Sequence, residues 1–236
     1  MGLKAAAAPA PYDPEELVAA LRQQGARYWD SHPFHARLHG GELTAHELRV
    51  WASNRWYYQR CLPMKDAAII SNCPIPEVRR IWVERVLYHD GRAEGSGGIA
   101  NWLRLAEAVG LCRDEVLDER HVVPGVRFAV DAYLRFARER SWVESVAAGL
   151  TEMFSPDLMR RRVDAMRRHY PWIEPGGLAY FESRLDVTTS DGSRALDLVV
   201  QHCRTRAEQD AAIDALRFKC DVLWAMLDAI DSPGRS

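Results

Sequence analysis

The chain has 236 residues, of which 47% are hydrophobic and 27% charged, so disorder, collagen and low-complexity fibre are excluded. Lys and Arg total 31 against 33 Asp and Glu, and the formal net charge of -2 lacks the basic excess of proteins that track nucleic acid. A chain of this length is compatible with one continuous core. We therefore expect one domain over residues 13–230, preceded by a flexible leader at 1–12 and followed by a polar tail at 231–236.

Cysteine usage and the lack of long apolar runs indicate the compartment. The cysteines are odd in number and never spaced as C-x-x-C, which argues against a disulfide framework and a zinc ribbon. They are Cys61, Cys73, Cys112, Cys203 and Cys220. Residues 1–11 are too poor in Leu and Val for a signal peptide, and no apolar run approaches the roughly 18 residues of a membrane span. We expect a soluble, cytoplasmic protein.

Four segments carry helix-start signals. Asp13-Pro14-Glu15-Glu16 offers an N-cap, a proline at the first helical position and a glutamate at the third. Residues 44–47 form a capping box, and 155–157 and 205–208 have similar chemistry. These signals predict helices beginning at each of the four positions.

Apolar residues recur with the helical period in two later stretches. One stripe is Val126, Val130, Tyr133, Leu134 and Ala137, and the other is Ile213, Leu216, Cys220, Leu223, Leu227 and Ile230. Only residues 187–189 hint at extended chain, and Pro63 should kink or end its helix. The sequence predicts a single compact all-α bundle of about seven to nine helices.

Conventional catalytic motifs are missing. The spacing of His32, His35 and His39 could place imidazoles on one helical face, as some metal sites require, but this is the minority interpretation. Di-iron carboxylate bundles use Glu-x-x-His on two helices, and the sequence contains no Glu-x-x-His. Nucleophile elbows, P-loops and dinucleotide-binding glycine motifs are also lacking.

Polar residues embedded in apolar helical faces are more informative. Lys65, Tyr133, Arg162 and Lys219 each have apolar neighbours three and four positions away. A buried cation must reach water along its stem, pair with a protein carboxylate, or meet an anionic ligand. For a single residue the first explanation is the simplest, but several together favour a ligand.

Two further groups share helical faces. Arg55, Tyr58 and Gln59 stand at i, i+3 and i+4, and Tyr180 and Arg184 repeat the i,i+4 pairing. Each could be an ordinary hydrogen-bonded pair at a helix interface. Together they suit a planar ligand with several carboxylates, because arginine grips carboxylates bidentately and stacks on flat rings.

A histidine follows at the end of another predicted helix. His89 lies where that helix gives way to the glycine-rich stretch 91–98, a position suited to proton transfer. A structural role is the usual one for a lone histidine.

The sequence resembles the pyrroloquinoline-quinone synthase family from about Leu17 to Ala229. The resemblance is carried by long segments in order: 32–35, 51–59, 63–68, 89–91, 98–110, 124–133, 169–173 and 218–220. It implies a heme-oxygenase-like bundle that binds no heme, forms a homodimer, and uses no metal or organic cofactor. The implied reaction closes a ring and oxidises a polycarboxylate quinone precursor, consuming O2 and releasing hydrogen peroxide.

The resemblance also implies site residues. His89, Tyr180, Arg184 and Tyr133 would be catalytic, with His89 as general base. The substrate would be bound by Tyr28, Arg55, Tyr58, Gln59, Lys65, Arg85, Arg162 and Lys219.

Two positions depart from the pattern of some family members: Trp29 and Met159 stand where those members have histidine. The departures leave open a non-catalytic relative that only binds a quinone. A di-iron helical-bundle oxygenase is the other alternative.

Overall fold

A long helix with a buried central segment, α3 (Ala45–Asn72), runs through the middle of the molecule. The structure is a computed structural model that describes residues 9–232, apart from the side chains of residues 156 and 186–191. Every residue of α3 from Trp51 to Gln59 is buried, including Arg55 and Gln59. A helix enclosed on all sides presents polar side chains to the interior wherever its sequence contains them.

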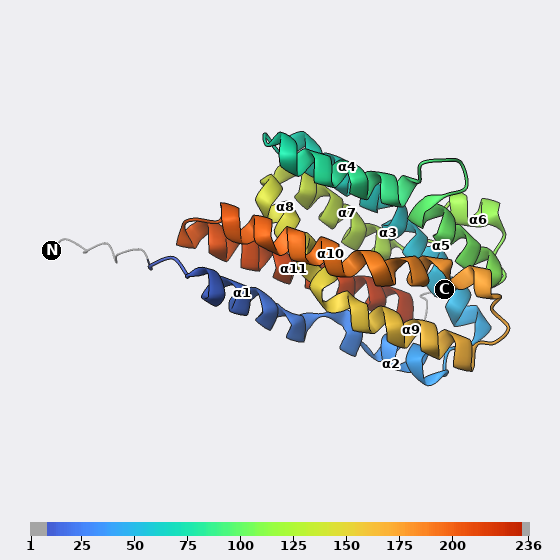
Figure 1. The fold of residues 1–236 in the computed structure, drawn as a ribbon. Coiled ribbons are helices and arrows are strands. Elements are labelled where there is room, and N and C mark those ends of the chain that lie inside the picture. The colour runs from blue at the N-terminus through green and yellow to red at the C-terminus, as the bar shows by residue number, and fades with distance from the viewer. Residues whose placement is uncertain (1–8, 233–236) are drawn as a thin grey trace.

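The other long helices pack around α3 along roughly the same axis (Figure 1). α3 contacts α4 (Pro76–Asp90), α7 (Pro124–Glu139) and α5 (Gly97–Ala108). α11 (Arg206–Asp231) packs on α7 and α8 (Trp142–Ala148). α10 (Ala179–His202) packs on α9 (Ser155–His169) and on the 3-10 segment η3 (Gly149–Phe154). The all-α prediction is confirmed.

Short elements complete the bundle. They are α1 (Pro14–Gln23), α2 (Pro33–Gly40), α6 (Arg113–Leu117) and the 3-10 segments η1 (Gln24–Arg27), η2 (Trp29–Ser31) and η4 (Pro175–Leu178). The described residues thus form eleven α-helices and four 3-10 segments, more than the seven to nine helices predicted. The difference comes from helices of five to eight residues, such as α6 and α2, which are too short to show a periodic stripe.

The helix-start signals were largely correct. Side chains of Asp13, Thr44 and Thr205 cap α1, α3 and α11 in capping boxes. α9 does begin at Ser155, but the Ser155 hydroxyl donates to the carbonyl of Glu152 (3.0 Å) instead of capping the helix. Both apolar stripes are buried.

The hint of extended chain at residues 187–189 was wrong, and of the two alternatives at Pro63 the end of the helix was wrong. Residues 187–189 are helical, within α10, because their β-branched side chains do not outweigh the helical residues on either side. α3 does not end at Pro63 and continues to Asn72. The ring of Pro63 removes one backbone donor, so the carbonyl of Gln59 loses its helical partner.

The chain ends were predicted as a leader and a tail. Residues 1–8 and 233–236 lie outside the described residues. Tyr12 is held against α11, where its backbone N–H donates to Gln209 Oε1 (2.7 Å) and its carbonyl accepts from Gln209 Nε2 (3.0 Å). Within residues 9–232, no helix has the length and apolar character needed to cross a membrane.

The start of α7 approaches the end of α11 closely at Gly125, where an added Cβ would lie 2.7 Å from the Cβ of Ala229. We expect Gly125→Ala to destabilise the protein by about 1 to 3 kcal/mol, because neither backbone can easily retreat. Urea unfolding measures the change. The matched control is Gly176→Ala, since a Cβ there meets nothing within 4 Å and should shift the unfolding free energy by less than about 0.5 kcal/mol. Equal stabilities of the two variants would contradict the packing at Gly125.

Candidate active site

A small enclosed cavity lies beside the buried segment of α3. It is lined by Tyr28, Trp29, Arg55, Tyr58, Leu62, Lys65, Arg85, Tyr133, Gly149, Thr151, Glu152, Ser155, Met159, Tyr180, Arg184, Lys219 and Leu223. Nine of the twelve predicted site residues are among these. Its free volume is about 60 Å³, room for only a few water molecules.

The remaining three predicted residues, Gln59, His89 and Arg162, are buried but do not line the cavity. Gln59 Oε1 accepts a hydrogen bond from the hydroxyl of Tyr180 (2.9 Å), which joins α3 to α10. His89 is at the end of α4, with Nε2 3.8 Å from Asp66 Oδ2. Arg162, on α9, is fully buried.

Three cations of the site, Arg85, Arg184 and Lys65, are paired with two protein carboxylates. Glu152 accepts two hydrogen bonds from Arg85 (2.9 and 2.7 Å) and one from Arg184 (3.3 Å). Asp66 pairs with Lys65 and lies 3.6 Å from Arg85 Nε. Burial alone would raise the pKa of Glu152, but Arg85 and Arg184 outweigh it and hold the carboxyl ionised.

Three other cations have no carboxylate partner within the described part of the chain. Arg55 lies over the rings of Trp29 and Tyr58, 4.4 and 4.7 Å from their centroids. Lys219 Nζ donates to the hydroxyl of Tyr58 (2.9 Å). Arg162 donates only to the imidazole of His35 (2.8 Å). Rings and neutral acceptors stabilise these charges without cancelling them.

The pKa values of Lys219 and Arg162 reflect burial without a carboxylate partner in the described structure. Burial, followed by repulsion from Lys65 and Arg55, lowers the pKa of Lys219 well below 10.5. Burial and then Arg55 lower the pKa of Arg162 to about 9. Each direction means that the protein groups of the site disfavour positive charge, which an anionic ligand would counter.

His89 is neutral at ordinary pH. Burial lowers the pKa of His89 to about 3, and Arg184, Arg85 and Lys65 act in the same direction while Asp66 opposes them. A neutral imidazole is the form that accepts a proton, but a pKa of about 3 makes it a weak base, and a bound anion would raise that pKa.

Two of the three histidines considered as metal ligands, His32 and His35, are engaged otherwise. His32 Nδ1 accepts from the N–H of Phe34 (3.0 Å) and its Nε2 contacts Asp228 (3.1 Å). His35 Nδ1 contacts the carbonyl of Trp29 (2.9 Å). In residues 9–232 no group of three or more His, Cys, Asp or Glu is arranged to hold a metal ion.

Sequence reasoning missed both carboxylates of the site. Asp66 directly follows Lys65 in α3, so the predicted burial of Lys65 could have pointed to Asp66 as its partner. Glu152 sits in η3, whose 3-10 geometry gives no apolar stripe to read. Trp29 and Met159, the two residues that depart from the pattern of some family members, both line the cavity.

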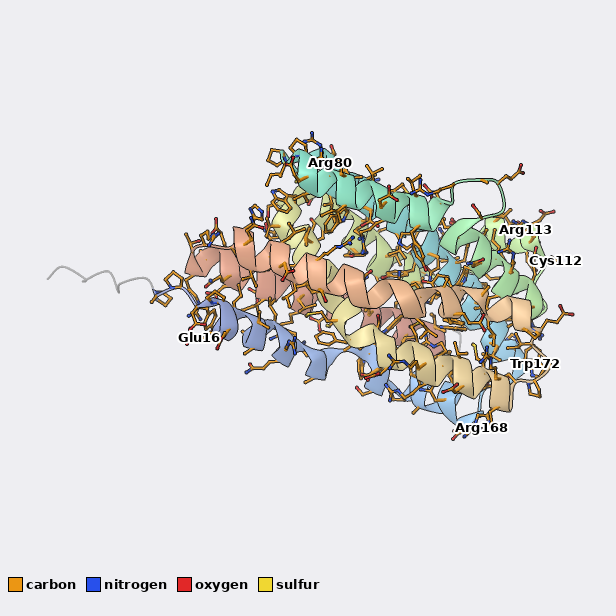
Figure 2. The ribbon with its side chains drawn as sticks, in the orientation of Figure 1. Glu16, Arg80, Cys112, Arg113, Arg168 and Trp172 are labelled. Carbon is orange, nitrogen blue, oxygen red and sulfur yellow. The ribbon has the colours of Figure 1, made fainter. Side chains whose placement is uncertain are left out.

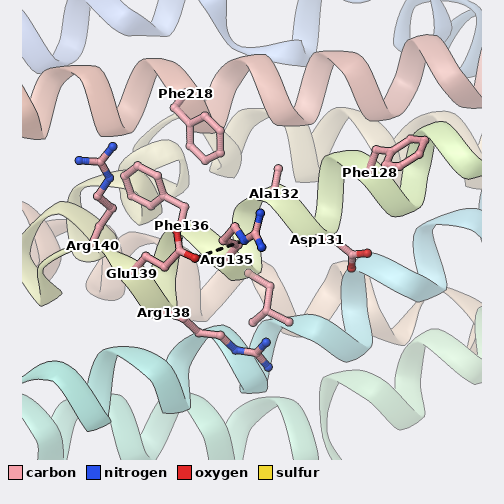
Figure 3. Close-up of a pocket in the computed structure, with 10 residues that line it drawn as sticks. Phe128, Asp131, Ala132, Arg135, Phe136, Arg138, Glu139, Arg140 and Phe218 are labelled. Atoms are coloured by element: carbon pink, nitrogen blue, oxygen red, sulfur yellow. Dashed lines mark ion pairs between the residues drawn. The ribbon is translucent and has the colours of Figure 1, made fainter.

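The molecular surface offers a contrast. Arg80, Arg113 and Arg168 point outward from the bundle (Figure 2). A second hollow opens on the outer face of α7 and α11, where Phe136 and Phe218 stack at 4.7 Å (Figure 3). None of the predicted site residues lines this hollow.

Solved structures share this architecture. A domain with a heme oxygenase-like fold from Shewanella denitrificans superposes with a TM-score of 0.77 at 11% identity, covering 93% of this chain and 92% of that one. A TenA homologue from Pseudomonas syringae gives 0.77 at 11% identity, covering 94% and 93%. The protein therefore has the heme-oxygenase-like helical fold.

Sequence comparison identifies the family to which the chain belongs within this fold. Residues 18–229 match the model of the TENA/THI-4/PQQC family, and the chain belongs to that family. It is 50% identical to the pyrroloquinoline-quinone synthase of Cronobacter sakazakii over 217 residues, 92% of this chain and 86% of the relative. It is also 50% identical to the enzyme of that name from Pseudomonas aeruginosa over 218 residues, 92% and 87%.

The unpaired charge of Lys219 predicts a stability effect. We expect Lys219→Met to stabilise the empty protein by about 1 to 3 kcal/mol near neutral pH, because a similar volume is buried without desolvating a cation. As pH rises from the lowered native pKa toward 10.5, the unfolded chain binds more protons than the native one, so the wild type gains stability and the difference shrinks. Urea unfolding over this pH range measures both effects. A variant less stable than the wild type at every pH would contradict the burial of an unpaired ammonium.

Proposed function

We propose that this protein is a pyrroloquinoline-quinone synthase, which closes a ring and oxidises a polycarboxylate quinone precursor to pyrroloquinoline quinone. The names of its relatives at 50% identity support a role in the biosynthesis of this quinone. The observation that carries the proposal is the trio of buried cations, Arg55, Arg162 and Lys219, without carboxylate partners in the described structure.

Unsatisfied donors indicate what the ligand must supply. Arg55 Nε and Nη1, Arg162 Nε and Nη1, and Gln59 Nε2 are buried without an acceptor. A buried donor without a partner costs about 1 to 3 kcal/mol. Carboxylates and quinone carbonyls are acceptors only, so a flat molecule bearing several of them would satisfy these groups.

The substrate requires more room than the present cavity gives. Because about 60 Å³ is free, the wall must move to admit a polycyclic guest. We place this movement at η3, because Glu152 of η3 accepts hydrogen bonds from the guanidinium groups of Arg85 and Arg184, which a substrate carboxylate would replace. For His89 to act on the substrate, a rearrangement must also bring its ring to the cavity, which it does not line.

The chemistry assigned to the side chains follows from their charge. His89 removes carbon-bound protons from the substrate, and the resulting electron-rich, quinol-like anion reduces O2 directly, without a metal or organic cofactor. Each O2 takes two electrons and two protons to leave as hydrogen peroxide. Arg184 and the hydroxyl of Tyr180 stabilise the negative charge that develops on oxygen, and Tyr133 lies at the same cavity.

A spectral titration followed by an oxygen-electrode assay tests the function. Pyrroloquinoline quinone should bind the purified protein with a shift of its visible absorption, and the precursor should cause O2 uptake that persists after strong chelation. Loss of uptake on chelation and its return with iron would support the di-iron oxygenase instead.

We expect His89→Ala to abolish turnover and to preserve binding of the quinone product, because the base is lost while the carboxylate-binding cations stay. Peroxide production and the spectral titration measure the two effects separately. Peroxide formation at the wild-type rate in this variant would remove His89 from the mechanism.

A non-catalytic quinone-binding protein is the second candidate, favoured by the cavity positions of Trp29 and Met159. Binding of pyrroloquinoline quinone without O2 consumption from the precursor would identify it. The proposal also includes the homodimer implied by the resemblance, which light scattering on the purified protein tests.

A further inference from the structure

His35 is a fully buried histidine of α2 that the proposed chemistry does not use. Its Nδ1 lies 2.9 Å from the backbone carbonyl of Trp29, and its Nε2 lies 2.8 Å from Nη2 of Arg162. The ring thus stands between a backbone oxygen and one of the three cations that lack a carboxylate partner in the described structure.

These two contacts fix the protonation of the ring. A carbonyl oxygen only accepts, so Nδ1 must carry a proton and donate to Trp29. A guanidinium only donates, so Nε2 must be unprotonated and accept from Arg162. Only the neutral imidazole with its proton on Nδ1 satisfies both neighbours.

The surroundings of the ring favour this neutral form. His35 is edge-on to Trp29 at 4.9 Å and stacked on His39 at 6.0 Å. Burial, followed by the charges of Arg162, His39 and Arg55, lowers the pKa of His35 well below 6.5.

We propose that His35 is a positioning residue, which holds the guanidinium of Arg162 through a neutral acceptor and so leaves its positive charge available to a ligand carboxylate. Where the site has a carboxylate as acceptor, as at Glu152, the arginines are paired with negative charge. At Arg162 an imidazole takes that place, and the flat faces of Trp51 and Phe181 lie 5.6 and 5.4 Å from the guanidinium. The inference rests on the proposed function, because it assigns Arg162 to substrate binding.

Three substitutions of His35 distinguish a role in holding the guanidinium of Arg162 from a role in filling space. His35→Gln keeps a neutral acceptor near the place of Nε2, His35→Leu removes the acceptor, and His35→Glu replaces it with a charge that pairs with Arg162. Affinity for pyrroloquinoline quinone, measured by spectral titration, should stay within about threefold of the wild type for His35→Gln, fall about tenfold for His35→Leu, and fall about a hundredfold for His35→Glu.

Thermal unfolding of the variants shows whether each one folds. The matched control is His39→Gln, on the same helix, since the Nε2 of His39 has no partner and its loss should leave affinity unchanged. A His35→Glu variant that binds the quinone as tightly as the wild type, or equal affinities for His35→Leu and His35→Gln, would overturn the proposal.

A second measurement does not need the quinone. Nitrogen NMR of the ¹⁵N-labelled protein should show His35 with a proton on Nδ1 only, unchanged as the pH is lowered to values where exposed histidines titrate. A proton on Nε2, or titration with the exposed histidines, would overturn the assigned geometry. Failure of the wild type to bind quinone, with the expected NMR signature intact, would contradict the proposed function and leave the geometry at Arg162 standing.

Discussion

The structure depends on how six buried cations are partnered around one cavity. Arg85, Arg184 and Lys65 are paired with Glu152 or Asp66, whereas three others are held by neutral groups. Those three are Arg55, Arg162 and Lys219. Burying a cation without a counter-charge costs several kcal/mol, and an anionic guest would remove this cost.

The bundle supports this arrangement by enclosing its central helix. α3 is buried along Trp51 to Gln59, so Arg55 and Tyr58 project into the interior from a rigid element. Lys219 reaches the same place from α11 and Arg162 lies behind the wall on α9. Sites built on packed helices keep their geometry better than sites on loops, which suits a reaction that depends on orientation.

Much of the fold could be predicted from local chemistry. Caps at Asp13, Thr44 and Thr205 act over three residues of chain, and the stripe ending at Ile230 reflects one buried face, so both are visible in sequence. Short helices such as α6 carry too few residues for a period to be detected. The continuation of α3 past Pro63 depends on neighbouring helices, which outweigh one lost hydrogen bond.

The site was predictable only where the signal lies within one helix. Apolar flanks identified Lys219 and Tyr133 as buried, because flanks lie on the same helix. Partners come from other elements: Glu152 meets Arg85 across 67 positions of chain, and His35 meets Arg162 across 127. The spacing of His32, His35 and His39 allowed a metal site only as the minority interpretation, and the acceptor role of His35 is visible only once α9 packs on α2.

Membership of the TENA/THI-4/PQQC family sets the fold, and the partnering of the cations is the basis of our proposal that this cavity binds a polyanion. The most direct test is proton uptake on binding of pyrroloquinoline quinone, measured by calorimetry in buffers of different ionisation enthalpy. Because a bound carboxylate raises the lowered pKa of Lys219, binding should take up protons from solution, and Lys219→Met should take up fewer. Binding with no net uptake at any pH between neutrality and the ordinary lysine pKa, or with proton release, would contradict the account.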